Sequence, residues 1–265
     1  MGDDILIRED AGAITTLTLN TPGSLNALSD AMIAALMVEF RALMVSDTQR
    51  VVILKGTGKA FCAGHDLKEM QTKRQAPDGG ASAWRDLFDR CGQMMQTIQR
   101  LPQPVIAQVH GVAAAAGCQL VASCDLAIAA EGTRFGVNGV NIGLFCSTPM
   151  VALSRVMPRK QVFEMLTMGE FIDAPRAREV GLINRVVPDA ALEAEAQALA
   201  HQIAGKLGSA VRIGKRAFYE QAQMPLDKAY EMTGAVMVEN MLDAQTDRGI
   251  AAFLDKRTPE WDQPE

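Results

Sequence analysis

The sequence is poor in the features that mark several classes of protein. Aromatic residues make up only 5% of its 265 residues, and no apolar run approaches the ~18 residues of a membrane span. His110 and His201 have no cysteine or carboxylate partners at metal-ligand spacing. Lys and Arg number 26 against 31 Asp and Glu, which gives a formal net charge of −5. We therefore expect no membrane span, no metal site and no nucleic-acid partner.

The cysteines do not form a disulfide or metal-binding pattern. There are five, an odd number, and none belongs to a Cys-x-x-Cys pair. The first residues, Met1 to Asp4, contain neither a basic segment nor an apolar one. Both features indicate reduced thiols in a reducing compartment, so the sequence predicts a cytoplasmic protein.

Buried-strand patterns alternate with helical ones up to about residue 190, and hydrophobic residues, at 48%, suffice for a large core. Strands are expected at residues 5–7, 14–19, 51–55, 105–109 and 126–129, and helices at 29–45, 84–100 and 115–123. This order is typical of an α/β fold with crossover connections. Beyond residue 189 the pattern is helical only, and its Met and Leu residues are too numerous for isolated surface helices.

Two stretches of alanine and glycine are the most informative feature of the chain. They run from Lys59 to Leu67 and from His110 to Leu120, and each follows a buried strand and enters a helix. Small side chains let a ligand approach the main chain, and first-turn amides of a helix have no intrahelical acceptor. Two such turns converging on one carbonyl oxygen would form an oxyanion hole. Tight packing of strand against helix is the alternative explanation.

These stretches belong to a series of sequence blocks that spans nearly the whole chain. The blocks are Pro22…Asn26-Ala27-Leu28, Lys59 to Met70, Gly117 to Leu120, Cys124 to Ala129 and Phe253 to Arg257. In order and spacing they resemble the enoyl-CoA hydratase/isomerase (crotonase) superfamily. Within it, Ala-Gly-His-Asp-Leu at residues 63–67 and the segment Gly143 to Pro149 resemble a hydratase-like subgroup.

The resemblance implies an α/β fold, a crotonase-type spiral of ββα units with a C-terminal helical oligomerisation region. Residues 1–190 would form the core, with the CoA-binding and oxyanion turns, and residues 191–265 the helical region. It also implies a homotrimer or homohexamer. The expected partner is an acyl-CoA thioester, with no separate cofactor because CoA is part of the substrate.

By the same resemblance, the N–H groups of Ala63 and Ala116 would hold the thioester oxygen and stabilise an enolate. The acid-base groups of family hydratases are missing. Two glutamates normally handle the water and its proton, and Gln119 and Gly139 occupy their positions. The Gln119 amide does not act as a general base, and Gly139 has no side chain that could do so. We therefore expect slow or lost hydration. Substituting Gln119→Glu together with Gly139→Glu would test this interpretation.

Two other functions remain open at this stage. His65 follows the first turn, where hydratases commonly carry alanine, and some superfamily decarboxylases carry Gly-His-Asp there. A decarboxylase or thioesterase that uses His65 is therefore an alternative, and a histidine that only holds the turn is another. The absence of both glutamates also favours a non-catalytic acyl-CoA-binding oligomer.

The resemblance also assigns residues to the substrate groove. Phe253 and Lys256, from this chain or a neighbouring subunit, are expected near the adenosine phosphates. Cys146 is expected to be a packed thiol rather than a nucleophile. The remaining groove residues are expected to be Ser24, Ala27, Ala60, Cys62 and Gly64.

Overall fold

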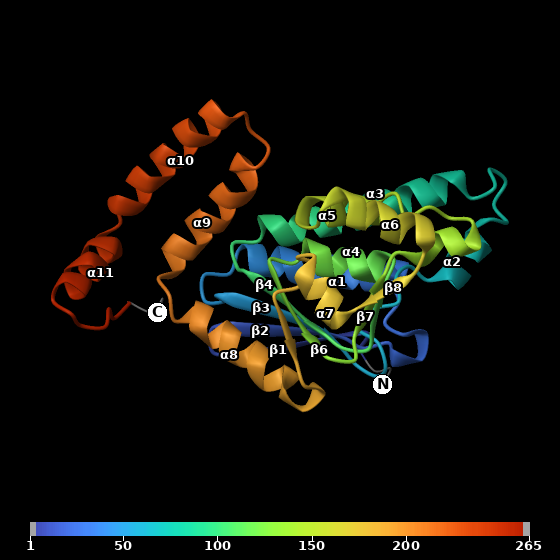
Figure 1. The fold of residues 1–265 in the computed structure, drawn as a ribbon, viewed down its shortest axis with the longest axis horizontal. Coiled ribbons are helices and arrows are strands. Elements are labelled where there is room, and N and C mark those ends of the chain that lie inside the picture. Colours follow the sequence, from blue (N-terminus) through green and yellow to red (C-terminus); the bar gives the residue numbers. More distant parts are fainter. Residues whose placement is uncertain (1–3, 262–265) are drawn as a thin grey trace.

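The computed structural model describes residues 4–261, and its helices and strands follow the expected order (Figure 1). The strands are β1 (Leu6–Ala11), β2 (Ile14–Leu19), β3 (Val51–Gly56), β4 (Val105–Val109), β5 (Val112–Ala114), β6 (Leu126–Ala130), β7 (Arg134–Gly136), β8 (Phe171–Asp173) and β9 (Arg185–Val187). The helices are α1 (Asp30–Met44), α2 (Leu67–Lys73), α3 (Ala81–Arg100), α4 (Ala116–Ser123), α5 (Pro149–Val156), α6 (Arg159–Met168), α7 (Ala174–Glu179), α8 (Leu192–Ala204), α9 (Gly208–Gln221), α10 (Leu226–Met241) and α11 (Ala244–Leu254).

Six strands form the main sheet in the order β1-β2-β3-β4-β6-β9. The opening hairpin is antiparallel, and every other neighbouring pair in this sheet is parallel. The central strands are buried on both faces, which explains their continuous apolar runs.

A second sheet, β5-β7-β8, continues from the ends of the main strands. β4 of the main sheet leads through β5 of the small sheet into α4, and β6 leads through β7 towards α5. β3 behaves alike, because Cys62 beyond its end forms an isolated bridge with Ala113 of β5. Each unit thus places one strand in each sheet before its helix. This arrangement confirms the expected spiral of ββα units.

Helices cover both faces of the main sheet (Figure 1). The larger core lies under α1, α3 and α4, while the smaller core joins the outward face of the strands to α8. Leu192, Ala196 and Leu199 of α8 pack in this smaller core with Val51 and Ile53. The boundary expected at residue 190 therefore falls just before a helix that completes the core.

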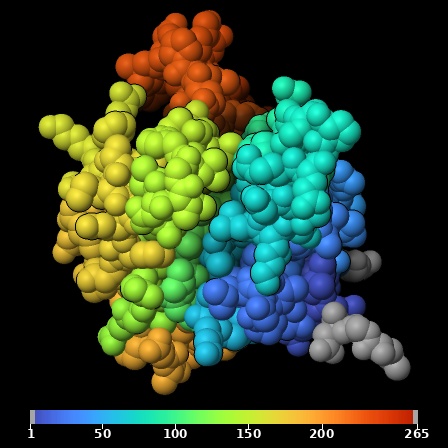
Figure 2. All heavy atoms as spheres, turned by 90° about the vertical axis from the view of Figure 1, so that its right-hand side faces the viewer, coloured from blue at the N-terminus to red at the C-terminus, as the bar shows by residue number. Residues whose placement is uncertain are grey.

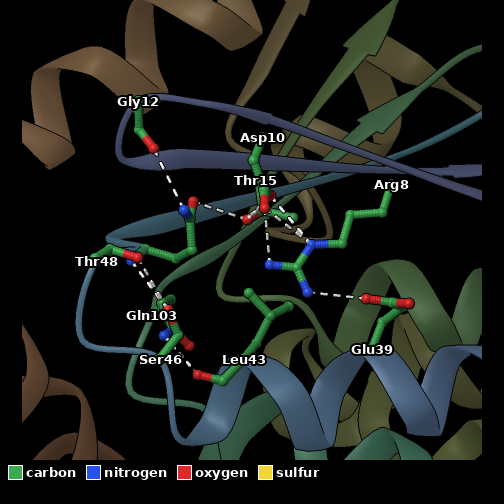
Figure 3. A network of polar contacts seen from close by, with 10 residues as sticks. Arg8, Asp10, Gly12, Thr15, Glu39, Leu43, Ser46, Thr48 and Gln103 are labelled. Carbon is green, nitrogen blue, oxygen red and sulfur yellow. Dashed lines mark hydrogen bonds and ion pairs between the residues drawn. The ribbon is translucent and has the colours of Figure 1, made fainter.

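Polar contacts attach the hairpin to α1 (Figure 3). The Arg8 guanidinium donates to Asp10 on its own strand and to Glu39 of α1, each at 3.0 Å. One turn further along α1, Gln103 Nε2 donates to the Leu43 carbonyl at 2.8 Å. At the start of α1, the Ser29 hydroxyl accepts the Met32 N–H and caps the helix. This cap fixes the end of the loop between β2 and α1, which borders the first small-residue turn.

The last three helices project from the body as an arm (Figures 1 and 2). A buried ion pair attaches the arm: Lys215 Nζ of α9 lies 2.6 Å from Asp125 Oδ2, beside β6. Tyr219 OH donates to the other oxygen of Asp125 at 2.8 Å, and the Val105 N–H donates to Oδ2. Asp125 is thus an acceptor at the start of β6, and it also orients α9.

Candidate active site

The two small-residue turns pack directly against each other. The Cys62 N–H donates to the Val112 carbonyl at 3.2 Å, and the Ala114 N–H donates to the Cys62 carbonyl at 3.0 Å. The segment after β3 thus extends the small sheet next to β5. The convergence that the sequence suggests is therefore present in the main chain.

Two glycines allow the main chains of the two turns to approach each other closely. A Cβ atom on Gly117 would lie 2.1 Å from the Cys62 carbonyl oxygen, a distance that no side chain tolerates. Gly64 has a φ of +96°, and its Cβ would lie 3.3 Å from the Ala116 nitrogen. Both positions therefore require glycine, and the first turn lies beside the first amide of α4.

Ala115 turns the chain into α4 in a strained conformation. Its φ of 47° and ψ of −116° lie where glycine is favoured, and its N–H donates to the Gly136 carbonyl at 2.8 Å. Ala116 is then the first residue of α4, and no acceptor is assigned to its N–H within residues 4–261. This amide is available to a ligand.

The amide of Ala63 is not available. It donates to the Leu25 carbonyl at 3.0 Å, so the expectation of a free donor at Ala63 is wrong. The Gly64 amide interacts with the Cys62 thiol. His65 follows, and in the described part of the chain no acceptor is assigned to its N–H. The free amide nearest to Ala116 in the first turn is therefore that of His65.

Gln119 lies one turn further along α4, on a buried surface. Its side chain is 4% exposed, and its Oε1 atom is buried without a hydrogen-bond partner in the described structure. Its carbonyl oxygen accepts the Ser123 hydroxyl at 2.8 Å. A buried acceptor without a partner is costly, so this side chain is suited to a ligand or a water molecule.

Gly139 cannot be replaced by a glutamate without moving the chain. A Cβ atom there would lie 2.2 Å from the Leu144 carbonyl oxygen and 2.8 Å from Cys146 Sγ. The Leu144 N–H also donates to the Gly139 carbonyl at 2.9 Å. The turn after Gly143 therefore occupies the space of a side chain at position 139, and the glutamate-restoring pair expected to test hydration is sterically blocked.

All five cysteines are free and buried. Burial raises the pKa of the Cys62 thiol and of the Cys118 thiol to about 12. Burial also raises the pKa of Cys146, although the Gly139 amide opposes this shift. Because the thiolate is the nucleophilic form, Cys146 is suited to packing rather than to attack on a thioester.

The environment of the His65 imidazole disfavours its charged form. Burial lowers its pKa, and the contact of Nδ1 with the Leu28 carbonyl at 3.4 Å opposes that shift only in part. The ring meets Phe88 edge to face at 5.7 Å, while Nε2 is buried without a partner in the described structure. The unpartnered Nε2 offers a lone pair to a proton, whereas burial disfavours the cation that would bind a carboxylate.

The residues expected to form the substrate groove differ in accessibility. The Ala27, Ala60 and Cys62 side chains are buried, so these positions can offer only main-chain atoms. Ser24 is exposed, and its hydroxyl donates to the Thr21 carbonyl at 3.1 Å. Gly64 is buried against the second turn.

Phe253 and Lys256 lie at the end of the arm. The Phe253 side chain is exposed, and α11 and α2 lie at opposite ends of the molecule (Figure 1). Within one chain these residues do not reach the small-residue turns, so the expectation that they line the same groove is wrong for a single chain.

Asn26 is an organising residue that the sequence analysis missed. It is fully buried with a φ of 54°, and its Nδ2 atom donates to the carbonyls of Thr57 and Ala60, each at 2.8 Å. It thereby attaches the loop before α1 to the first turn. The available signal was the Asn-Ala-Leu block itself, whose asparagine tolerates a left-handed backbone.

Within residues 4–261, no group of three His, Cys, Asp or Glu side chains has the arrangement of a metal site. Among the described helices, none combines the length and apolar character needed to cross a bilayer.

The double-sheet spiral and the paired turns define a class that comparison identifies. The family model for enoyl-CoA hydratase/isomerase matches residues 9–264, and the chain belongs to this family. It is 44% identical over 248 residues to human enoyl-CoA hydratase domain-containing protein 3, mitochondrial, which covers 94% of this chain and 80% of that protein. The expected subgroup is thereby confirmed. The cytoplasmic location stays a prediction, since the name of this relative places it in mitochondria.

Solved structures agree with the sequence comparison. An enoyl-CoA hydratase from Mycobacterium smegmatis is 50% identical, with a TM-score of 0.94 over 98% of this chain and 99% of that one. The human domain-containing protein 3 is 40% identical, with a TM-score of 0.92 over 97% of this chain and 100% of that one. The crotonase-type fold expected from the sequence is therefore confirmed.

Proposed function

We propose that this protein binds an acyl-CoA thioester and stabilises its enolate with two main-chain amides, those of Ala116 and His65. The proposal rests on the close packing of the two turns, in which Gly64 approaches the Ala116 nitrogen. The His65 amide follows Gly64 directly. Membership of the enoyl-CoA hydratase/isomerase family supports a CoA thioester as the ligand.

The physical basis is a preorganised pair of donors. As an enolate forms, negative charge moves onto the thioester oxygen, and fixed N–H groups stabilise that charge without reorganising. Ala116 adds the positive end of the α4 dipole, because it is the first residue of that helix. Such donors lower the activation barrier by several kcal/mol in acyl-transfer enzymes.

Gln119 and Gly139 do not favour the addition of water to a double bond. Gln119 does not titrate, and position 139 has no side chain. Each missing acid-base group costs roughly 10²–10⁴-fold in rate. We therefore expect very slow hydration of crotonyl-CoA even with both amides in place.

His65 supports a second candidate function, in which its imidazole moves a proton. Its Nε2 atom is buried, neutral and without a partner in the described structure. Such a nitrogen can accept the α-proton of an acyl-CoA, or a proton from water in thioester hydrolysis. A decarboxylase that holds a carboxylate with a charged His65 is disfavoured, because burial lowers the pKa of this side chain.

Matched ligands and one substitution separate these functions. Calorimetry compares butyryl-CoA with S-butyl-CoA, a thioether without the carbonyl, and we expect tighter binding of the thioester. Proton exchange at the α-carbon in D₂O, followed by NMR, then reports enolate formation. His65→Phe keeps the backbone N–H and the contact with Phe88, so binding should survive while exchange is lost.

Other outcomes point elsewhere. Equal binding of thioester and thioether would reject the two-amide site. Binding without exchange, with either histidine or phenylalanine at position 65, would favour the non-catalytic acyl-CoA-binding oligomer. Fast hydration of crotonyl-CoA by purified protein would contradict the expected loss of acid-base chemistry.

A homotrimer or homohexamer is part of the proposal. The arm exposes large apolar side chains that a monomer would leave in water, among them Leu226, Tyr230, Leu242 and Phe253. Sedimentation equilibrium gives the mass directly. A second copy seated on the arm would also explain how Phe253 and Lys256 reach a CoA groove.

A further inference from the structure

A cavity of about 730 Å³ opens beside Gln119, between helices α3, α4, α5 and α9. Each helix presents one face to it, since the lining positions recur at helical spacing. α9 packs against α3 and contributes Tyr219 and Glu220 to the lining. The lining residues are Gly92, Met95, Gln96, Gln99 and Arg100 of α3, Gln119 and Ser123 of α4, Thr148, Val151, Ala152 and Arg155 at α5, and Tyr219, Glu220 and Gln223 at the end of α9. Its volume is that of a small-molecule site.

The cavity begins at Gln119, on the helix whose first residue is Ala116. Gln119 lies one turn beyond Ala116, and Ser123 follows one turn later on the same face. The axial distance from Ala116 to Ser123 is about 10 Å, which is the reach of a medium acyl chain. A thioester oxygen at the Ala116 amide would therefore direct its acyl group past Gln119 into this space.

The inner wall contains a polar atom that requires a partner. Gln119 Oε1 is buried and makes no hydrogen bond in the described structure, although the residue lines the cavity. The neighbouring Ser123 hydroxyl already donates to the Gln119 main chain. The acyl group is thus met by a free side-chain amide as well as by apolar atoms of Met95 and Ala152.

The outer wall has an excess of positive charge. Arg100 and Arg155 are exposed and line the cavity together with one carboxylate, that of Glu220. Arg100 Nη2 donates to Gln96 Oε1 at 3.1 Å, and Arg155 Nη1 donates to the Val151 carbonyl at 2.8 Å. Neither arginine forms an ion pair within residues 4–261. Both retain free N–H donors for a planar anion.

We propose that this cavity selects acyl-CoA thioesters whose acyl chain ends in a carboxylate, with Arg100 and Arg155 as specificity-determining residues. The inference rests on the proposed function, because it requires the thioester to lie at Ala116. Guanidinium groups bind carboxylates through paired, charge-assisted hydrogen bonds. A neutral chain end would leave both arginines at the mouth without an anion and gain nothing from them.

The test uses two ligands of equal chain length. Octanoyl-CoA and suberoyl-CoA differ only in the terminal carboxylate of the second, and calorimetry gives the dissociation constant of each. We expect suberoyl-CoA to bind at least about tenfold more tightly at low ionic strength, with the difference shrinking as salt is added. In the double variant Arg100→Gln/Arg155→Gln the difference should disappear, while octanoyl-CoA keeps its affinity.

Arg159→Gln is the matched control, because it removes one exposed positive charge at the start of α6, outside the cavity. It should leave the preference unchanged. Equal or tighter binding of octanoyl-CoA to the wild-type protein would overturn the inference, as would a preference that survives the double variant. If neither thioester binds, the proposed function fails first. Sedimentation of each variant checks that loss of the arginines has not altered the assembly, and a preference lost only through dissociation would also count against the assignment.

Discussion

Gly139 provides the sharpest test of why this chain lacks the hydratase carboxylates. Gly139→Ala introduces a Cβ atom 2.2 Å from the Leu144 carbonyl oxygen and 2.8 Å from Cys146 Sγ. The nearer atom is main chain, so the clash cannot be relieved by rotating a side chain. Overpacking of this kind costs about 3 kcal/mol of unfolding free energy.

For a chain of this size, 1 kcal/mol corresponds to roughly 2–4 °C in the midpoint of thermal unfolding. We therefore expect Gly139→Ala to lower the midpoint by ~6–12 °C in a scanning calorimeter. Adding Cys146→Ala removes only the more distant contact, so most of the loss should remain. Gly139→Glu should be at least as destabilised.

Gly214→Ala is the control for this measurement. Gly214 lies within α9, and a Cβ atom there meets nothing within 4 Å. Alanine is the better helix former, so this variant should gain about 0.5–1 kcal/mol. An unchanged midpoint for Gly139→Ala, or a folded Gly139→Glu that hydrates crotonyl-CoA, would refute the steric argument.

Three further predictions concern strain, the buried ion pair and pH. Ala115→Gly should raise the unfolding free energy by up to about 1 kcal/mol in urea titrations, because it relieves a φ of 47°; a destabilised variant would show that the turn is unstrained. Lys215→Met should cost roughly 3–5 kcal/mol in the same assay, because it leaves Asp125 buried without its cation; a loss below 1 kcal/mol would contradict this. Since burial lowers the pKa of His65, the unfolded chain binds more protons below pH 6.5, and stability should rise as pH increases to 6.5 and then level off. His65→Phe should flatten that slope, and an equal slope in both proteins would assign it to other groups.

Much of the fold could be predicted from local pattern. The central strands β3 and β4 are continuous apolar runs, and Ser29 marks the start of α1. These signals act over a few residues, where the periodicity of apolar side chains and the helix-capping residues determine the local structure. The resemblance to the family then supplied the spiral order of the units, which no local pattern contains.

The site was harder to predict, because its chemistry depends on main-chain hydrogen bonds. The family motif indicates the turn that contains Ala63. Only the structure shows that the Ala63 N–H already donates to the Leu25 carbonyl. Ala115 likewise acts through a positive φ that alanine does not favour, and Asn26 acts through buried hydrogen bonds to two carbonyls. Sequence therefore located the turns, while the assignment of free donors required three-dimensional contacts.

The two missing carboxylates are lost in different ways, and this limits what the protein can do. At position 119 an amide replaces a carboxylate of the same shape and leaves a buried acceptor facing a cavity. At position 139 the main chain of Leu144 fills the space, so the loss is built into the path of the following turn. One substitution can restore the first group, whereas the second requires the turn itself to be rebuilt. Under the proposed function, proton transfer near the thioester comes from His65, from water held by Gln119 or from the substrate, because a carboxylate at position 139 would need the following turn to move.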